Sequence, residues 1–227
     1  DEAERLVMAE RGGIQMGFLA YTYGTNGIPI PDDKPFAVSL IDTDRMVREI
    51  GRLREAGVDV VTVSLHFGAE YQRLPNDEQR RIARAAIGAG ADIVLGSHPH
   101  VVQPYDIVNV SASESALGEE RSGVVIYSLG NFISNQTGDW KDVGLIFGVH
   151  LKKIQQPDGS SVTTWDRVSL EPTTVRITGQ GRNRHYTVLP LRDTLASRDV
   201  PGMTESEYAR LQKMLDGIEE HLRVYRK

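Results

Sequence analysis

The stretch from Val58 to His100, VDVVTVSLHFGAEYQRLPNDEQRRIARAAIGAGADIVLGSHPH, predicts the fold of this chain. Val58–Leu65 is a β-branched run typical of a buried strand, and Asp92–Leu95 is a second one. Between them, Asn76 and Gln79 have the spacing of a capping box that opens a helix. A strand, a helix and a strand in this order form a right-handed crossover, so we expect two parallel strands whose carboxyl ends share one edge of a sheet.

Similar elements flank this unit, which places the chain in the α/β class. Strands of an antiparallel portion are expected further along the chain, and one domain over 1–200 should be followed by a helical appendage over 201–227. The boundary would lie near 199–204. The expected strands are Ile14–Thr22, Val124–Leu129, Gly144–Ile154 and Ser161–Leu170, and the expected helices are Ala3–Glu10, the segment from Asp42 or Thr43 to Gly57, and the segment that begins at Thr204.

Composition excludes several classes of protein. The 227 residues carry a net charge of −5, whereas nucleic-acid-binding domains are normally basic, so we expect no nucleic acid partner. There is no cysteine, so a metal site must use His, Asp, Glu or Asn. No apolar run reaches the roughly 18 residues that span a bilayer. Because Asp1 is not an initiator methionine, we expect a trimmed or processed piece of a longer protein.

Three histidines follow the two strands of the crossover unit. His66 comes directly after one strand, and His98 and His100 come just after the other. Ligands of open α/β sheets bind beyond the carboxyl ends of the strands, so we expect the three imidazoles to converge there. Pro99 favours an extended backbone at His98, which would point His98 and His100 to the same side. The set suits a pair of divalent ions about 3.5–4 Å apart, or a single zinc ion.

Other polar residues near these strand ends have two interpretations each. Glu70, Tyr71 and Arg73 share the loop after His66 and could orient a ligand or contact a substrate, or they could be solvated loop residues. Asn131 follows another strand; its amide could bind substrate or orient a ligand, or it could simply favour a turn after Gly130. Four arginines could line a basic groove or form a solvated helix face: Arg73, Arg80, Arg81 and Arg84. We interpret the other three histidines, His150, His185 and His221, as ordinary residues without a role in the site.

At these residues the sequence resembles the CapA-type family of poly-γ-glutamate capsule-synthesis proteins. The match follows the family's order of motifs from about Gly13 to Phe132, and it is looser from Gly144 onward. The motifs that carry it are His66 with the following Phe67–Tyr71, the run Gly90–Pro104 around Ser-His-Pro-His, and Tyr127–Phe132.

This family is similar to the calcineurin-like metallophosphoesterases. The resemblance implies a four-layer α/β/β/α sandwich, here without its N-terminal portion. By resemblance His66 matches the isolated metal-binding histidine, and His98 and His100 match a Gly-His-x-His motif, with Ser97 inserted after Gly96. His100 would also assist catalysis. The implied cofactor is a divalent transition metal, Mn, Fe or Zn, with two ions in the complete protein.

The resemblance also implies partners and a location. The partners would be poly-γ-glutamate or the subunits of its synthase. The longer protein would be anchored in the cell membrane with this domain on the extracellular face of the bacterium, while the 227-residue chain would be a soluble part of it.

The sequence lacks some motifs of the superfamily, and their absence leaves two hypotheses for the function. An early metal-binding Asp, a bridging carboxylate and an Asn-His pair have no counterpart in the sequence. The histidines alone would hold a weaker, mononuclear site, so we expect this chain by itself to show little phosphoesterase activity. The two hypotheses are a metal-dependent hydrolase with a metallophosphoesterase-like site, and a non-catalytic accessory subunit that binds polymer or partner subunits of the synthase.

Overall fold

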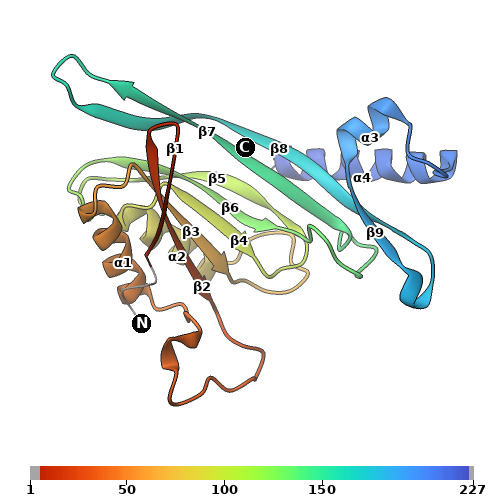
Figure 1. Cartoon of the computed structure of the whole chain (residues 1–227), viewed down its shortest axis with the longest axis horizontal. Coiled ribbons are helices and arrows are strands. Elements are labelled where there is room, and N and C mark those ends of the chain that lie inside the picture. The colour runs from red at the N-terminus through yellow and green to blue at the C-terminus, as the bar shows by residue number, and fades with distance from the viewer. Residues whose placement is uncertain (1–5, 225–227) are drawn as a thin grey trace.

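Two β-sheets form the frame of the protein, for which a computed structural model describes residues 6–224. The larger sheet has six strands in the order β1-β2-β3-β4-β6-β5, and the smaller has three in the order β7-β8-β9 (Figure 1). The strands of the larger sheet are β1 (Val7–Arg11), β2 (Ile14–Thr22), β3 (Val60–His66), β4 (Ile93–Ser97), β5 (Val102–Val110) and β6 (Arg121–Leu129). Those of the smaller sheet are β7 (Val143–Gln155), β8 (Ser161–Thr178) and β9 (His185–Pro190).

The centre of the larger sheet is parallel. Strands β2, β3, β4 and β6 run in one direction, and β1 and β5 pair antiparallel at its two edges. The predicted crossover unit is confirmed: β3 and β4 are parallel neighbours, with His66 in register with Ser97. The carboxyl ends of the parallel strands therefore meet at one edge, where the predicted site lies.

Two helices connect these strands and begin at the predicted caps. In α1 (Thr43–Glu55) the Asp42 side chain accepts a hydrogen bond from the Arg45 amide. In α2 (Asp77–Ala89) the predicted capping box is present, with Asn76 and Gln79 each bonded to the other's backbone amide. Both caps satisfy amide groups that the first helical turn leaves without partners.

The larger sheet is covered on both faces. Apolar side chains of α1 and α2, among them Met46, Ile50 and Ile87, pack on one face. Strands β7 and β8 pack on the other through Phe147 and Trp165. These layers form an α/β/β arrangement (Figure 1), a mixed α/β fold, and they do not by themselves establish the four-layer sandwich that the resemblance implies.

The C-terminal helices share a core with both sheets. Leu211 and Ile218 of α4 (Glu205–Val224) are in one apolar cluster with Ile126 of β6, Val143 of β7 and Leu191 of α3 (Leu191–Ser197). The predicted capping pair at the start of α4 is present, because the Thr204 and Glu207 side chains bond each other's backbone amides. The segment 201–227, expected as an appendage, thus packs on the body as far as it is described.

One expectation about a single element was wrong, a second was right only in part, and one strand was not predicted. The helix expected over Ala3–Glu10 is strand β1 in its described part, which turns into β2 through Gly12 and Gly13, both at positive φ. The 124–129 strand was assigned to the antiparallel portion; β6 does pair antiparallel with β5, but on its other side it pairs in parallel with β4. Strand β5, which was not predicted, separates β6 from solvent at that edge of the sheet.

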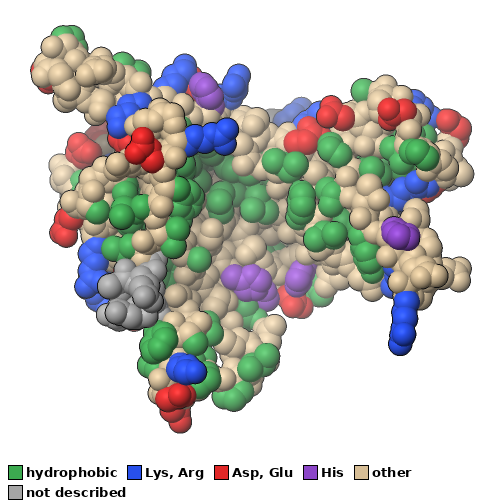
Figure 2. All heavy atoms as spheres, in the orientation of Figure 1, with side chains coloured by type: hydrophobic (Ala, Val, Ile, Leu, Met, Phe, Trp, Pro, Cys, Tyr) green, Lys and Arg blue, Asp and Glu red, His purple; other side chains and the backbone are tan. Residues whose placement is uncertain are grey.

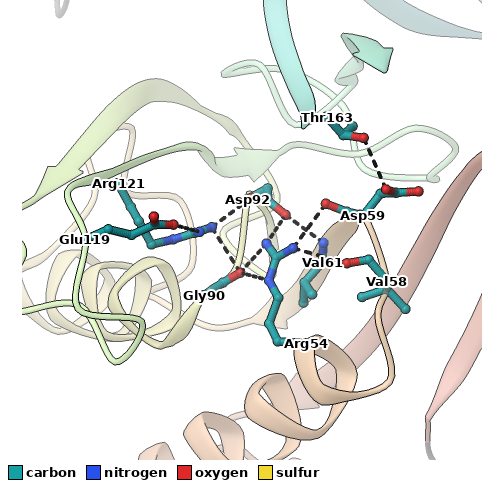
Figure 3. A network of polar contacts seen from close by, with 9 residues as sticks. All are labelled: Arg54, Val58, Asp59, Val61, Gly90, Asp92, Glu119, Arg121 and Thr163. Carbon is teal, nitrogen blue, oxygen red and sulfur yellow. Dashed lines mark hydrogen bonds and ion pairs between the residues drawn. The ribbon is translucent and has the colours of Figure 1, made fainter. Parts of the chain in front are cut away.

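A polar network closes the edge of the sheet at the amino ends of β3 and β4 (Figure 3). The Asp92 carboxylate contacts Arg54 and Arg121 and accepts the Val61 amide at 2.7 Å. Both guanidinium groups also donate to the Gly90 carbonyl. No helix in the described part of the chain is long and apolar enough to cross a membrane.

Candidate functional site

The three predicted histidines lie together at the carboxyl edge of the larger sheet. The ring centres of His66 and His98 are 4.8 Å apart, and those of His98 and His100 are 6.2 Å apart. Figure 2 shows histidine side chains gathered in one place on the surface, beside an acidic side chain. The predicted convergence is confirmed, and it follows from the parallel pairing of β3 with β4.

The backbone reason given for this convergence was wrong. His98 has φ +103° and His100 has φ +58°, so neither is extended. Pro99 disfavours the right-handed helical region at His98, and the chain turns through positive φ instead. The Pro99 carbonyl accepts a hydrogen bond from the Tyr71 amide at 2.8 Å, which ties this turn to the loop after β3.

Hydrogen bonds orient two of the imidazoles. His66 Nδ1 lies 3.1 Å from the Ser97 hydroxyl, and His100 Nδ1 lies 2.9 Å from Asn131 Oδ1. The Asn131 amide nitrogen donates to the Lys141 carbonyl at 2.8 Å, so its oxygen must face His100. An amide oxygen can only accept, so Nδ1 of His100 carries the proton and Nε2 keeps its lone pair.

The loop between β3 and α2 covers the His100 end of the cluster. Glu70 Oε1 is 3.9 Å from His100 Nε2, and the Tyr71 ring stacks on His100 with centres 6.1 Å apart. Arg73 lies over the Trp140 ring at 3.9 Å, and Lys141 lies over the Tyr71 ring at 5.5 Å. Three of the four predicted loop and turn residues, Glu70, Tyr71 and Asn131, therefore contact His100. Arg73 instead contacts Trp140, which packs on His221 of α4 and not on the cluster.

A buried amide fixes this loop in place. Gln103 on β5 is fully buried and donates from Nε2 to the carbonyls of Gln72 and Leu74 at 2.8 and 3.1 Å. Its oxygen accepts from Gln79 Nε2 at 2.9 Å. Gln103 was not predicted as a site residue, because a glutamine in a strand carries no sequence signal for such a role.

Burial lowers the pKa of two of the three imidazoles. For His66 the pKa lies below its ordinary value because of desolvation first and then the nearby His98 and His100. For His98 desolvation also lowers the pKa most, while Glu70 acts in the opposite direction. Both rings are therefore neutral at pH 7, the form in which imidazole binds a metal.

The cluster fits one metal ion in part and does not fit two. Two imidazoles that bind a tetrahedral ion through nitrogens at about 2 Å have ring centres about 5 Å apart, which the His66–His98 pair matches at 4.8 Å. His100 is too distant to join without moving. Among residues 6–224, no three histidine, aspartate or glutamate side chains are placed to hold an ion. A two-ion centre also needs a carboxylate between the ions, whereas Glu70 lies at the His100 end.

Comparison with known proteins places the chain in a family. The family model described as bacterial capsule synthesis protein PGA_cap matches residues 1–136, which include β1 to β6 and all three histidines of the cluster. The chain belongs to the PGA_cap family of bacterial capsule synthesis proteins.

Two curated relatives bear names from capsule biosynthesis. The chain is 29% identical over 139 residues to the capsule biosynthesis protein CapA of Bacillus anthracis, a match over 60% of this chain and 31% of that protein. It is 41% identical over 95 residues to the PGA biosynthesis protein CapA of Bacillus subtilis (strain 168), over 42% of this chain and 22% of that protein. The PGA_cap chain thus spans less than a third of the length of these relatives.

Solved structures give weaker similarities. A hypothetical protein from Thermus thermophilus is 16% identical with a TM-score of 0.37, over 82% of this chain and 61% of that one. The sulfate thiohydrolase SoxB of the same organism is 14% identical with a TM-score of 0.37. That match covers 94% of this chain and 28% of the SoxB chain. The NAD nucleotidase NadN of Haemophilus influenzae is 11% identical with a TM-score of 0.39. That match covers 96% of this chain and 42% of the NadN chain. Scores this low do not establish a shared fold.

The remaining basic residues of the PGA_cap chain do not join the cluster. Arg84 pairs with Glu114 at 2.7 Å and Arg81 reaches Glu78 at 4.0 Å, both on the surface of α2. Arg80 donates to the Pro75 carbonyl at 3.4 Å. These contacts favour the helix-face interpretation of the three arginines, and Arg73 lies over Trp140. Of the other histidines, His150 pairs with Asp166, His221 packs on Trp140, and His185 is exposed.

Acidification is expected to destabilise the metal-free PGA_cap chain. The pKa values of His66 and His98 are lowered from 6.5, so below that pH the unfolded chain binds more protons than the folded one. The stability present at neutral pH is then lost as the pH falls from 6.5 towards the lowered values. Thermal unfolding between about pH 7.5 and about pH 5 should show a smaller decrease in Tm for His98→Asn than for the wild type. His185→Asn is the exposed control, and equal decreases in all three proteins would contradict this.

Proposed function

We propose that this chain is part of a capsule synthesis protein and supplies the imidazole ligands of a hydrolase-like metal site. The observation that carries the proposal is the spacing of His66 and His98, 4.8 Å between ring centres, with the pKa of both lowered by burial. Neutral imidazoles suit Zn or Fe in the divalent state, whereas Mn prefers oxygen ligands. Such an ion, when bound, polarises a water molecule or an ester oxygen.

His100 has a separate role in this proposal. Its Nδ1 proton is directed to Asn131, which leaves Nε2 as a proton acceptor beside Glu70. In that position His100 would take a proton from an attacking group or return one to a leaving group, and Asn131 would keep the ring in the correct tautomer.

The complete protein is expected to do more than this chain. The resemblance implies two ions in the complete protein, which needs a carboxylate between them, and the described residues do not place one in that position. We therefore propose that this chain alone binds at most one ion and has little phosphoesterase activity. We also propose that the longer protein acts on the extracellular face of the membrane.

A second candidate function is binding of an anionic polymer without hydrolysis. It is favoured by two cations that lie over aromatic rings: Lys141 over the Tyr71 ring, which stacks on His100, and Arg73 over the ring of Trp140, the neighbour of Lys141 in the chain. Aromatic support fixes each cation where it can meet a carboxylate of poly-γ-glutamate. Measuring polymer binding with and without a metal chelator distinguishes the two functions. A polymer held by these cations alone stays bound in the presence of the chelator.

A titration of the 227-residue chain with Co²⁺ tests the metal proposal. Calorimetry at neutral pH should show about one equivalent bound, and His98→Ala should weaken binding by at least about 100-fold, since even residues that only orient a ligand are worth 10–100-fold. The matched control is His150→Ala, a histidine on β7 that pairs with Asp166. Binding that is unchanged in His98→Ala, or reduced equally in His150→Ala, would exclude the cluster as the site.

A further inference from the structure

A tyrosine that directly follows a third strand, β2, lies against the paired histidines. Tyr23 follows β2, whose last residue, Thr22, is in register with His66 on β3. The Tyr23 amide donates to the His66 carbonyl at 2.9 Å, so the β2–β3 ladder continues to this point. The same parallel topology that collects the histidines therefore brings Tyr23 to them.

The Tyr23 ring contacts both members of the pair. It is stacked on the His66 ring with an interplanar angle of 12° and a centre distance of 6.0 Å. It is tilted by 39° on the His98 ring, with centres only 4.4 Å apart. One aromatic ring thus lies against both imidazoles, on a different side from Glu70 and Tyr71, which contact His100.

The ring is held at both ends. Its hydroxyl donates to Asn26 Oδ1, and Asn26 has φ +53° in a tight turn closed by the Ile28 amide on the Thr25 carbonyl. Beside it is a recess of about 180 Å³ whose walls include Tyr23, Phe67 and Ile82. The hydroxyl bond is exposed and a hollow adjoins the ring, so the contacts with the two imidazoles contribute most to holding the ring against the cluster.

From these contacts we infer that Tyr23 is a positioning residue of the metal site, an inference that rests on the proposed function. Its ring keeps His66 and His98 at the spacing that one ion requires and excludes water from one side of the pair. An ion would then enter from the side of His100 and Glu70. Without the ring, both imidazoles gain rotational freedom that metal binding must remove, so affinity decreases.

Co²⁺ binding by the complete 227-residue chain and its variants tests this inference. Tyr23→Ala and Tyr23→Leu remove the ring, and each should weaken Co²⁺ binding by about tenfold or more. Tyr23→Phe keeps the ring and should bind within about threefold of the wild type, since an exposed hydroxyl bond contributes little. The matched control is Tyr186→Ala, because Tyr186 is also partly exposed and also donates to an asparagine, Asn135, but lies on β9.

A second readout does not depend on metal. In the metal-free chain, the NMR signals of the His66 and His98 ring protons should shift in Tyr23→Ala as the ring current is lost, and they should stay in place in Tyr186→Ala. Circular dichroism confirms that each variant is folded, and Tyr23→Leu replaces Tyr23→Ala if the latter is not. The inference is overturned if the wild type binds Co²⁺ and both ring-deleted variants bind it equally well. Absence of binding by the wild type would overturn the proposed function itself, and this inference with it.

Discussion

Gly96→Ala is expected to destabilise the protein by at least about 3 kcal/mol, the upper range for overpacking in a core. A Cβ atom at Gly96 would lie 2.0 Å from the Tyr127 carbonyl oxygen and 2.8 Å from that of Ile126. Both are backbone atoms of β6, so no side chain can rotate away. Strands β4 and β6 would have to separate immediately before His98, and the histidine cluster would be displaced with them.

Gly51 provides the matched control for this substitution. It lies within α1, and a Cβ atom there meets nothing within 4 Å. Gly51→Ala should therefore stabilise the helix by about 0.5–1 kcal/mol, because alanine loses less backbone entropy than glycine. Urea unfolding measures both changes, and a midpoint for Gly96→Ala equal to that of the wild type would contradict the close approach of β4 and β6.

Asp92→Asn is expected to lower the free energy of unfolding by about 2–3 kcal/mol. Its carboxylate joins the Arg54 and Arg121 guanidinium groups and the Val61 amide (Figure 3). Removing the shared carboxylate leaves the nearly buried Arg54 without its counter-charge and Arg121 with only Glu119 at 3.9 Å. Breaking such a pair costs about 3–5 kcal/mol at a fully buried site. The Asp92 side chain is 19% exposed, so solvent screening reduces that figure.

An exposed ion pair elsewhere in the fold provides the comparison for this prediction. Arg84 and Glu114 form an ion pair at 2.7 Å with side chains that are 47% and 45% exposed. Glu114→Gln should cost no more than about 1 kcal/mol, as exposed pairs do. Chemical denaturation compares the two variants, and equal losses would show that the Asp92 network contributes no more than a surface ion pair.

The elements that sequence predicts well are those whose local signals agree with the tertiary fold. The capping box of Asn76 and Gln79 and the β-branched strands around it all led to the observed crossover unit. The expectation for Ala3–Glu10 was wrong because Gly12 and Gly13 were taken as the end of a helix. With both at positive φ they form the tight turn of a hairpin, for which a Gly-Gly pair is equally typical.

Strand β5 was missed for a related reason. Pro104 lies within it, and proline in a run of residues argues against a central strand. The structure resolves this because β5 is the edge strand of the sheet, where a missing amide donor is tolerated. The pairing of β6 with β5 bears out its assignment to an antiparallel portion, whereas its parallel pairing with β4 was not expected.

The candidate site was predictable where topology alone decides it. Parallel pairing of two strands was enough to bring His66 to His98 and His100. Sequence did not identify Tyr23, because an aromatic residue after a buried strand is usually interpreted as part of the core. Nor could it predict that His98 and His100 both adopt positive φ, since that depends on the contacts between the Pro99 turn and the loop of Tyr71.

The most direct test of the metal site is anomalous X-ray diffraction from crystals of the 227-residue chain grown with Co²⁺. We predict one anomalous peak between the rings of His66 and His98, within about 2.2 Å of a nitrogen of each, and no second ion beside it. Crystals of His98→Ala should lose that peak. An ion bound only at other histidines, with the space between His66 and His98 free of anomalous density, would contradict the account.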